Sequence, residues 1–452
     1  MIVVKFGGTS VGDAEAIERA ASIVRGRLPG RPVIVVSAMG GATNALLALA
    51  EQAAKGQLIG AARAVEALRE RHLNAVTALV PDPKAASDLA TELGAMFDEL
   101  ARLAEAISVL GFLTPRSLDT IAAYGEILSS HLVTAAFRAR DIPAELIDAR
   151  RVMITDDHFC KAEPDAERIA DAARAQLLPH LREGRVPIMG GFVGATPDGI
   201  TTTLGRGGSD YSASLVGAAL QADVIEIWTD VDGMLTADPR VVPDARLIER
   251  IRFDEASELA SFGAKVLHPS TIAPAVRRGI PVYIYNSRRP EGKGTLITSD
   301  APRRPVSAIA AKSATTVVKL RSTRMLLASG FMKTVFEIFE RHRTSVDVIA
   351  TSEVSLSVTL DDPSNLDELL GDLTPLGDVS VERGRGIVSI VGAGLSDNGV
   401  ALARAFGALG DLRVHMASLS ATGINLTLVV DGEHVGRAMQ RLHDAFFGEG
   451  AT

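Results

Sequence analysis

The chain begins with an apolar run that leads directly into a glycine loop. Residues 2–4 are Ile-Val-Val, and the residues that follow are Lys5-Phe6-Gly7-Gly8-Thr9-Ser10. This order predicts a strand and then a loop whose glycines approach an anion closely and adopt backbone conformations closed to other residues, so that N–H groups point at phosphate oxygens. It matches neither G-x-x-x-x-G-K-[ST] nor G-x-G-x-x-G. Because a Gly-Gly pair after a strand is more often a tight turn, the loop needs support from elsewhere in the chain.

Strands and helices alternate over the first 230 residues. A helical pattern at 13–28 precedes a second apolar, β-branched run at 32–37, and residues 44–140 predict three or four helices with breaks at 81–83 and 111–115. Later elements are strands at 185–194, 200–204 and 224–229, a hairpin turn at 197–199 and a helix at 211–221. Such alternation predicts an α/β fold with a mostly parallel sheet between helices.

The C-terminal third contains an internal repeat. Residues 288–305, rich in proline and glycine, mark a domain boundary. Residues 331–360 predict a helix, a strand over 345–350, a turn and an alternating strand, and residues 399–430 repeat this order, with Phe406 in the place of Phe336. Duplication of a small β-α-β-β unit accounts for the pattern, and two such units make a small α+β module.

Composition excludes several classes of partner. At 452 residues, two or three domains are expected. A net charge of -8 argues against a nucleic-acid or anionic-membrane partner, and no apolar run approaches the length of a membrane span. The single cysteine, Cys160, cannot form an internal disulfide, which suits a reducing compartment, and we read it as an ordinary thiol. The N-terminus lacks the pattern of a signal peptide, so a cytoplasmic protein is expected.

A second glycine loop lies two hundred residues downstream. It runs from a predicted strand into a helix and reads Gly205-Arg206-Gly207-Gly208-Ser209-Asp210. The start of a helix offers free N–H groups and a positive dipole end to an anion. The guanidinium of Arg206 is suited to grip a carboxylate with two parallel hydrogen bonds. For Asp210 a simple N-cap role is the alternative.

Polar residues after the strand at 224–229 form a third candidate loop. Thr229 and Asp230 lie where this strand ends, and ligands in open α/β sheets bind outside the carboxyl ends of strands. Further cations follow at Arg240 and Lys265. Asp230, Asp232 and Asp238 lack an accompanying His or Cys, so no transition-metal site is predicted.

Read together and in order, these loops resemble the aspartokinases. The resemblance covers essentially the whole chain and rests on 5–10, 36–44, Gly125-Glu126, 205–210, 228–231, 238–240 and 262–269. It implies the amino-acid kinase fold, a mostly parallel sheet sandwiched by helices, followed by two α+β ACT (ferredoxin-like) domains. The implied catalytic domain spans 1–295, with an N-lobe for aspartate and a C-lobe for ATP. The regulatory region spans 304–452, with 319–385 inserted in a domain made of 304–318 and 386–452.

The implied reaction moves the γ-phosphoryl group of ATP to the β-carboxylate of L-aspartate, giving 4-phospho-L-aspartate, the first step towards lysine, threonine and methionine. A carboxylate with a pKa of about 3.9 is ionised at neutral pH and needs no general base. Cations, backbone amides and Mg²⁺ held mainly by the nucleotide phosphates must bring two anions together. The alternatives are a kinase of another acceptor, such as glutamate or N-acetylglutamate, and a non-catalytic amino-acid sensor.

The resemblance also implies roles for individual residues. Lys5 contacts the transferring phosphoryl group, Arg206 the α-carboxylate of aspartate and Glu126 its ammonium group, while Asp210 either orients Lys5 or receives the amine. Other substrate positions are Ser37, Thr43, Gly207, Gly208 and Ser209. Nucleotide positions are Gly7, Gly8, Thr9, Thr229, Asp230, Arg240, Lys265 and Val266.

An effector site is implied in the C-terminal region, for an amino acid that the resemblance suggests is L-lysine. Asp347 and Glu353 are suited to pair with its two ammonium groups, and the helix after Gly330 offers amides to its carboxylate. The full set is Met325, Gly330, Phe331, Ser345, Val346, Asp347, Thr351, Ser352 and Glu353. Core packing is the alternative for Met325 and Phe331. A homodimer through the ACT domains is expected, and a tetramer is possible.

Overall fold

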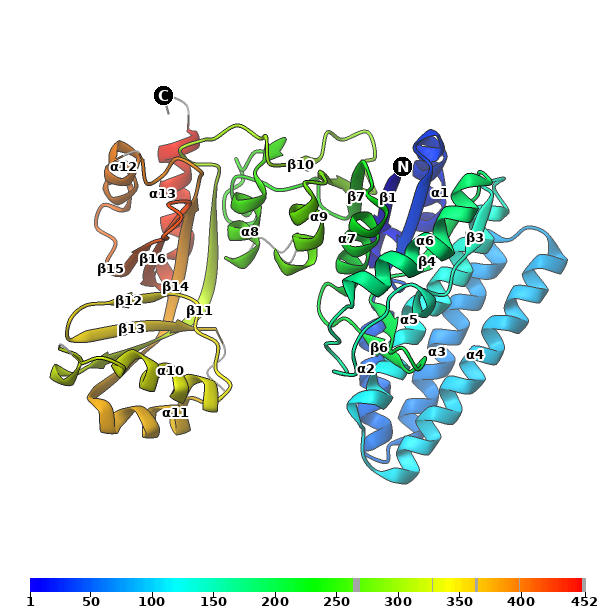
Figure 1. Ribbon diagram of the computed structural model, residues 1–452, viewed down its shortest axis with the longest axis horizontal. Helices are drawn as coiled ribbons and strands as arrows, with labels where there is room; N and C mark the ends of the chain where they lie inside the picture. Colours follow the sequence, from blue (N-terminus) through cyan, green and yellow to red (C-terminus); the bar gives the residue numbers. More distant parts are fainter. Residues whose placement is uncertain (263–268, 327, 362–364, 398, 449–452) are drawn as a thin grey trace. The chain divides into compact units, whose positions relative to one another are not determined.

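The computed structural model describes residues 1–262, 269–326, 328–361, 365–397 and 399–448. The chain divides into two compact units (Figure 1). Unit 1 comprises Met1–Met234 and Leu267–Ser299, and unit 2 comprises Leu235–Val266 and Asp300–Thr452. The segment after residue 234 therefore packs with unit 2, whereas the catalytic region expected from the sequence runs on to residue 295. No helix within the described ranges is long and apolar enough to cross a membrane.

Unit 1 is built on the predicted parallel sheet. Its strands lie in the order β3-β4-β2-β1-β7-β9-β10, and every neighbouring pair is parallel except β9 and β10. Their bounds are β1 Ile2–Phe6, β2 Pro32–Val36, β3 Ala144–Leu146, β4 Val186–Gly190, β7 Val224–Thr229, β9 Val282–Asn286 and β10 Thr295–Ile297. Strands β1 and β2 are apolar almost throughout because both of their faces are covered by helices.

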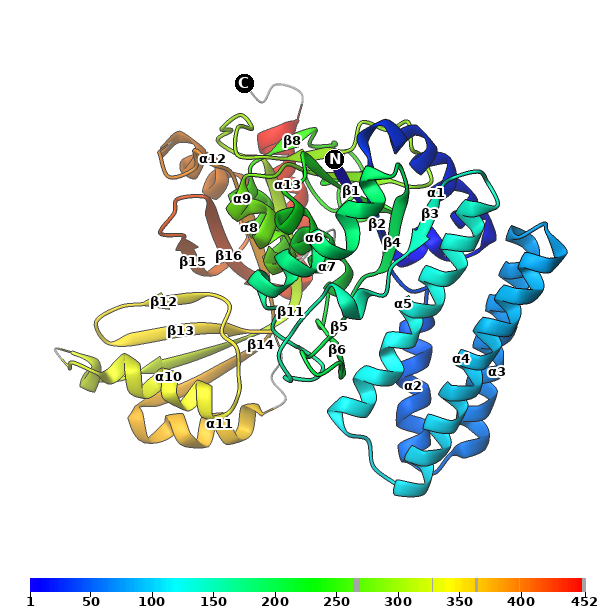
Figure 2. The ribbon, with the colours of Figure 1, turned by 45° about the vertical axis from the view of Figure 1, so that its right-hand side comes forward.

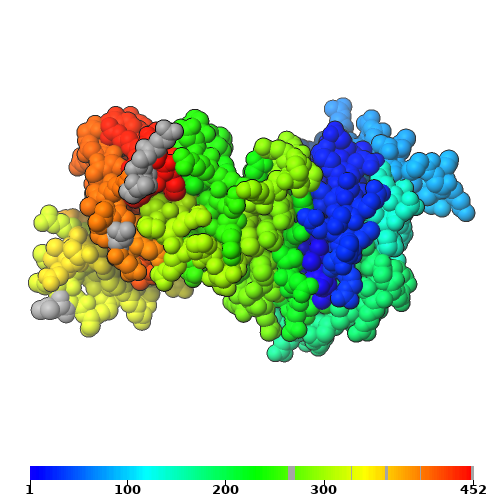
Figure 3. Space-filling model, turned by 90° about the horizontal axis from the view of Figure 1, so that it is seen from above, coloured from blue at the N-terminus to red at the C-terminus, as the bar shows by residue number. Residues whose placement is uncertain are grey.

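The predicted helical segment forms four helices, which Figure 2 shows running alongside one another. They are α2 Ala42–Ala54, α3 Leu58–Leu79, α4 Pro83–Leu110 and α5 Pro115–Arg138. Both predicted breaks are confirmed: Asp82 and Thr114 cap the following helices, each with proline next, and Gly111 ends α4 with φ of 72°. The α3 and α4 residues protrude from unit 1 in the space-filling view (Figure 3).

Four further helices complete unit 1: α1 Ala14–Arg27, α6 Ala166–Arg182, α7 Gly208–Leu220 and α9 Ala273–Arg278. Helix α7 begins three residues before the predicted start, so Ser209 and Asp210 lie in its first turn. A separate hairpin, β5 Val193–Ala195 and β6 Thr201–Thr203, closes through the predicted turn at 197–199 and leads into the second glycine loop.

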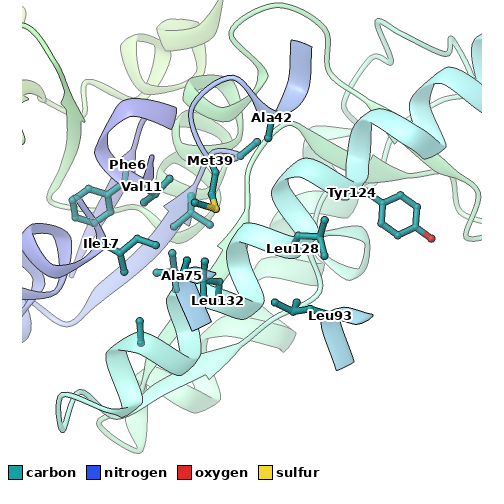
Figure 4. Close-up of a cluster of buried hydrophobic side chains, with 14 of the residues drawn as sticks. Phe6, Val11, Ile17, Met39, Ala42, Ala75, Leu93, Tyr124, Leu128 and Leu132 are labelled. Atoms are coloured by element: carbon teal, nitrogen blue, oxygen red, sulfur yellow. The ribbon is translucent and has the colours of Figure 1, made fainter. Parts of the chain in front are cut away.

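Alternation along β1 places its side chains on opposite faces of the sheet. Val4 and Phe6 belong to the large core formed with α1 and α5, where Met39 and Leu132 also lie (Figure 4). Lys5 lies between them in sequence and therefore faces the other side, where α7 contacts β1. Alternate residues of β1 thus pack into the core, while Lys5 places its ammonium group on the opposite face of the sheet.

Unit 2 contains an antiparallel sheet in the order β12-β13-β11-β14-β16-β15. Its strands are β11 Ala308–Arg321, β12 Ile349–Thr351, β13 Ser355–Leu360, β14 Asp378–Val391, β15 Val414–Leu419 and β16 Asn425–Asp431. Its helices are α8 Phe253–Ser261, α10 Phe331–Arg341, α11 Leu366–Leu373, α12 Gly399–Leu409 and α13 Val435–Phe447, and the short strand β8 is Arg250–Ile251.

Two of the hydrophobic cores along this sheet include helices of unit 2. One joins the second half of β11 and β13 to α10 and α11, and the other joins the first half of β11, β14 and β16 to α12 and α13. The long strands β11 and β14 pair over both halves, with a register shift near Lys312 where Ala314 has φ of 63°. The sheet therefore belongs to two α+β halves at once, in agreement with the predicted duplication.

The predicted strand over 345–350 is wrong in extent. Strand β12 begins only at Ile349 and ends at Thr351. Asp347 and Val348 both oppose Thr359 of β13: the N–H of Asp347 donates to the carbonyl of Thr359, and the N–H of Thr359 donates to the carbonyl of Val348, each at 3.0 Å. The N–H of Val348 donates to the hydroxyl of Thr359 at 2.9 Å. Because two residues face one, the regular register is broken here and β12 begins only after them.

Candidate active site

A cavity of about 610 Å³ in unit 1 gathers most of the residues predicted to bind substrate. Loops at the carboxyl ends of β1, β2 and β6 and the first turn of α7 form its walls, together with one face of α5. The predicted residues that line it are Lys5, Ser37, Thr43, Glu126, Arg206, Gly207, Gly208, Ser209 and Asp210. Residues more than 200 positions apart in the sequence therefore face one space.

Lys5 and Asp210 form an ion pair in this cavity. The ammonium nitrogen of Lys5 lies 2.6 Å from Oδ1 of Asp210, and both side chains are largely buried. Asp210 occupies the first turn of α7, where an acidic residue is favoured by the helix dipole. Because Lys5 leaves the strand on the face that α7 covers, the pair fixes the direction of the ammonium group.

Glu126 is the most strongly perturbed acid of the cavity. It lies on α5 and is 3% exposed. Burial raises the pKa of its carboxyl to about 8, although the backbone N–H of Ala38 and the charge of Lys5 oppose that rise. Among the described residues, none hydrogen-bonds to its buried Oε2. An unpaired buried oxygen of this kind is suited to receive a cationic ligand group.

The loop that carries Arg206 has a constrained backbone. Gly205 and Gly207, on either side of Arg206, have φ of 74° and 73°. Residues with a side chain rarely adopt this backbone conformation. Arg206 is exposed and lines the cavity. Two left-handed glycines therefore turn the chain sharply at this point, and the guanidinium lies in the wall of the cavity at the start of α7.

Part of the interpretation of the first glycine loop is wrong. The backbone N–H of Gly7 donates to the carbonyl of Trp228 at 2.9 Å, so it extends the sheet and does not face a ligand. Gly7 has φ of -69°, which any residue adopts. Close approach is what requires glycine here: a Cβ on Gly8 would lie 3.1 Å from the carbonyl oxygen of Ala38. The glycines allow two loops to pack against each other.

Asp119 lines the same cavity and was not predicted as a site residue. Its carboxylate is 1% exposed and accepts hydrogen bonds from the N–H of Cys160 at 2.9 Å and from the N–H and hydroxyl of Thr203 at 3.0 and 2.6 Å. It therefore ties α5 to the segment that leads into the Arg206 loop. The only feature that could have indicated Asp119 as a site residue is its position on α5, two turns before Glu126.

Cys160 also lines the cavity, although the sequence suggested an ordinary thiol. Burial raises the pKa of this thiol to about 11, and the neighbouring Asp119 carboxylate acts in the same direction. The thiol is therefore protonated at neutral pH and forms part of the wall. The remaining lining residues that the sequence did not indicate are Asn44, Leu47, Leu118, Ala122, Phe192 and Thr203.

The predicted nucleotide residues are spread over several places. Thr229 is the last residue of β7, and its hydroxyl donates to the next residue, Asp230, at 3.3 Å. Thr9 lies in the 3-10 turn Gly8–Val11 of unit 1. Arg240 belongs to unit 2, is 80% exposed at its side chain and donates hydrogen bonds to Asp238 through its backbone N–H, its Nε and its Nη2. Lys265 and Val266 lie outside the described residues.

The predicted effector residues form two groups within unit 2. Met325, Gly330 and Phe331 lie before or at the start of α10, whereas the segment 345–347 follows its end, and a helix of eleven residues is about 16 Å long. Thr351 pairs with Leu356 on β13 near the first group, and Ser352 and Glu353 follow it. Met325 and Phe331 also pack against one hydrophobic core, as the alternative interpretation held, and Val346 packs against the same core.

Asp347 has charged neighbours of its own. The ammonium of Lys312 lies 3.8 Å from Asp347 and 2.6 Å from Asp361. Burial and a hydrogen bond with Asp361 raise the pKa of Asp347 to about 6, and the charge of Lys312 opposes that rise. Two carboxylates that share one ammonium leave one negative charge, which can accept a further cation.

Comparisons with known proteins agree with this architecture. Residues 1–286 match the model of the Amino acid kinase family, and residues 388–446 match that of the ACT domain. Lysine-sensitive aspartokinase 3 of Escherichia coli (strain K12) is 40% identical over 456 residues, with 99% of each chain covered. Aspartokinase 1, chloroplastic, of Arabidopsis thaliana is 37% identical, covering 99% of this chain and 80% of the plant protein.

Solved structures are similar along the whole chain. E. coli aspartokinase III in complex with aspartate and ADP has a TM-score of 0.86 at 39% identity, covering 99% of this chain and all of that one. The same enzyme in complex with lysine and aspartate has a TM-score of 0.83, with 99% of both chains covered. A long match to the family model and 40% identity over almost the full length lead to one conclusion. The chain belongs to the amino acid kinase family and, within it, to the aspartokinases.

Proposed function

We propose that this protein is an aspartate kinase that transfers the γ-phosphoryl group of ATP to the β-carboxylate of L-aspartate. The observation that carries the proposal is the single cavity that Lys5, Glu126, Arg206 and Asp210 all line. These four residues supply two cations and two acids, a set suited to an amino acid with a second carboxylate. The relative bound to aspartate and ADP supports the same substrates.

Different residues of the cavity bind different groups of the substrate. Arg206 holds the α-carboxylate with two hydrogen bonds, and Glu126 receives the ammonium group at its unpaired oxygen. Ser37 and Thr43 contact the reacting end, and Gly207, Gly208 and Ser209 line the cavity at the start of α7, whose dipole adds positive potential. The β-carboxylate then faces Lys5.

Transfer requires positioning and charge more than proton chemistry. The aspartate β-carboxylate is ionised at neutral pH, so it attacks phosphorus without a base. Its negative charge and that of the phosphates repel each other, and the ammonium of Lys5 lowers that repulsion most where charge accumulates on the transferring oxygens. Asp210 holds Lys5 in this direction. The bond to the β-phosphate oxygen breaks, and ADP leaves.

ATP binds, on this proposal, at the loops after β1 and β7, with Gly7, Gly8, Thr9, Thr229 and Asp230 in its wall. Mg²⁺ is carried mainly by the phosphates, since no group of three or more His, Cys, Asp or Glu residues within the described ranges is arranged to hold a metal. The ion neutralises phosphate charge when bound.

The regulatory region, residues 304–452, is proposed to bind L-lysine. Asp347 and Glu353 pair with the two ammonium groups, and the N-terminus of α10 after Gly330 receives the carboxylate. Within one chain these groups lie towards opposite ends of α10, so we propose that two copies, paired through their ACT domains, complete the site together. A relative named lysine-sensitive supports the choice of effector.

The domain boundaries are part of the proposal. The catalytic domain covers 1–295, and one ACT domain, 319–385, is inserted in another made of 304–318 and 386–452. Pairing of Ala308 with Val391 supports the second assignment, because the first strand of the region returns to its last segment.

A coupled assay tests the reaction. Incubation with ATP, Mg²⁺, L-aspartate and hydroxylamine should yield aspartyl hydroxamate, because the acyl phosphate is trapped by the amine. Glutamate and N-acetylglutamate in place of aspartate distinguish the alternative kinases. If folded protein yields no hydroxamate, the result would instead favour a non-catalytic sensor. Calorimetry would then measure how tightly that sensor binds lysine and aspartate.

A further inference from the structure

Arg71, on α3, holds two loops of the active site although it does not line the cavity itself. Its Nη1 donates to the carbonyl oxygen of Gly40 at 2.7 Å, and its Nη2 donates to the carbonyl oxygen of Gly12 at 2.6 Å. Gly40 belongs to the loop between β2 and α2, and Gly12 follows the 3-10 turn after β1. One side chain therefore bridges the loop of the first strand and the loop of the second.

The two loops are also in direct backbone contact with each other. The N–H of Ser37 donates to the carbonyl of Phe6 at 3.0 Å. A Cβ on Gly40 would lie 3.3 Å from the carbonyl oxygen of Gly8, tighter than most real contacts. The loops are therefore joined at their base by the sheet and at their outer end by a guanidinium, with glycines packed between.

The chemistry of arginine suits this task. A guanidinium presents its N–H donors in one rigid plane, so two terminal nitrogens hold two carbonyl oxygens at a fixed spacing. A lysine ammonium is a point charge on a flexible stem and does not fix that spacing. Because a trans peptide points its C=O and N–H in opposite directions, turning the Gly40 carbonyl towards α3 turns the N–H of Gly41 away from it.

We infer that Arg71 is a positioning residue that sets the separation between the phosphate loop, 7–12, and the acceptor loop, 37–43. The inference rests on the proposed function, which assigns Gly8 and Thr9 to the nucleotide and Ser37 and Thr43 to the acceptor. Phosphoryl transfer depends on in-line alignment, and a misplacement of about 1 Å costs roughly 100-fold in rate. Arg71 acts through these loops and touches neither substrate.

The test compares Arg71→Gln and Arg71→Lys with Arg63→Gln, a control at an exposed position on the same helix. We expect Arg71→Gln to lower kcat by about 100-fold and Arg71→Lys by about tenfold, while the Kd of ADP and of aspartate, each measured alone, changes by less than about threefold. Arg63→Gln should match the unaltered protein. A folded Arg71→Lys with unchanged kcat overturns the inference, as does a loss of binding equal to the loss of kcat.

Two further measurements separate positioning from general stability. Millimolar methylguanidine should restore part of the kcat of Arg71→Ala, since it replaces the missing group, but should not affect Arg63→Gln; no recovery in a folded variant contradicts the inference. Hydrogen exchange at residues 8–12 and 37–41 should accelerate in Arg71→Lys while α3 keeps its protection. That readout does not use the reaction, so a failed hydroxamate assay and failed loop positioning are distinguishable.

Discussion

The ammonium of Lys5 lies 2.6 Å from the carboxylate of Asp210, across more than 200 residues of sequence. Of the two roles open to Asp210, this geometry favours orientation of Lys5 over receipt of the substrate amine. Glu126 is then the residue that binds the substrate amine. Its Oε2 is buried and has no hydrogen-bond partner within the described part of the chain. The cavity thus separates a paired acid, which holds a catalytic cation, from an unpaired acid, which waits for a ligand cation.

Lys5→Ala should lower kcat by about 100-fold or more, because the charge is needed most in the transition state. ADP affinity, measured by calorimetry, should change far less. Lys55→Ala, at an exposed lysine, is the matched control. Equal losses of kcat and nucleotide affinity would contradict the role given to Lys5.

Glu126 should couple aspartate binding to pH. Its pKa is raised to about 8, so at pH 7 the empty cavity holds a protonated acid, and pairing with the substrate ammonium should release about one proton. Calorimetry of aspartate binding in buffers of different ionisation enthalpy measures the number of protons released. Glu126→Gln should bind aspartate weakly and release none; an undiminished release in this variant would assign the proton to another group.

The same pKa predicts the direction of a stability change. Between pH 4.5 and about 8 the folded protein keeps a proton that the unfolded chain has lost, so this group makes the free energy of unfolding fall as pH rises. Urea denaturation at several pH values should show a shallower fall for Glu126→Gln than for the unaltered protein. Parallel curves would show that the carboxyl is ionised in the folded state.

Asp119→Ala should destabilise unit 1 by about 1–3 kcal/mol, because the backbone N–H groups of Cys160 and Thr203 would lose their acceptor. It should also raise the KM for aspartate, since Thr203 precedes the Arg206 loop. Asp88→Ala, at an exposed acid on α4, provides the control. A variant with unchanged stability would show that the three hydrogen bonds contribute little.

Asp347→Asn should weaken inhibition by lysine at least tenfold while kcat stays close to normal. In the unaltered protein, inhibition should weaken as pH falls through about 6, where the raised pKa of Asp347 places its protonation. Asp367→Asn, at an exposed acid in α11, is the control. Normal inhibition of Asp347→Asn would refute the assigned effector site.

Much of unit 1 could be predicted because its signals are local. Strands β1, β2 and β7 are short apolar runs, and Asp82 and Thr114 cap helices where the sequence breaks. Long-range contacts were beyond the sequence. The bonds of Arg71 to Gly12 and Gly40 span 59 and 31 residues, and nothing in the pattern of α3 indicates them.

Errors in the sequence interpretation have local causes. The predicted strand at 345–350 was shortened because Asp347 and Val348 both oppose Thr359, an irregular pairing that periodicity does not reveal. Gly7 was assigned an N–H for phosphate, yet this N–H, directly after β1, donates to the carbonyl of Trp228. In both places the hydrogen bonds of the backbone, which the sequence pattern does not indicate, decide the structure.

The place of Cys160 gives the protein a built-in attachment point for probes. It is the only cysteine of the chain and lies in the wall of the cavity, so a thiol-reactive fluorophore would label one position without any cysteine being removed. Its raised pKa makes alkylation slow at neutral pH and faster in mildly alkaline buffer, because the thiolate is the reacting form. Slower alkylation of Cys160 in the presence of an unlabelled, unreactive ligand would then show that the ligand occupies the cavity. This measurement does not depend on turnover.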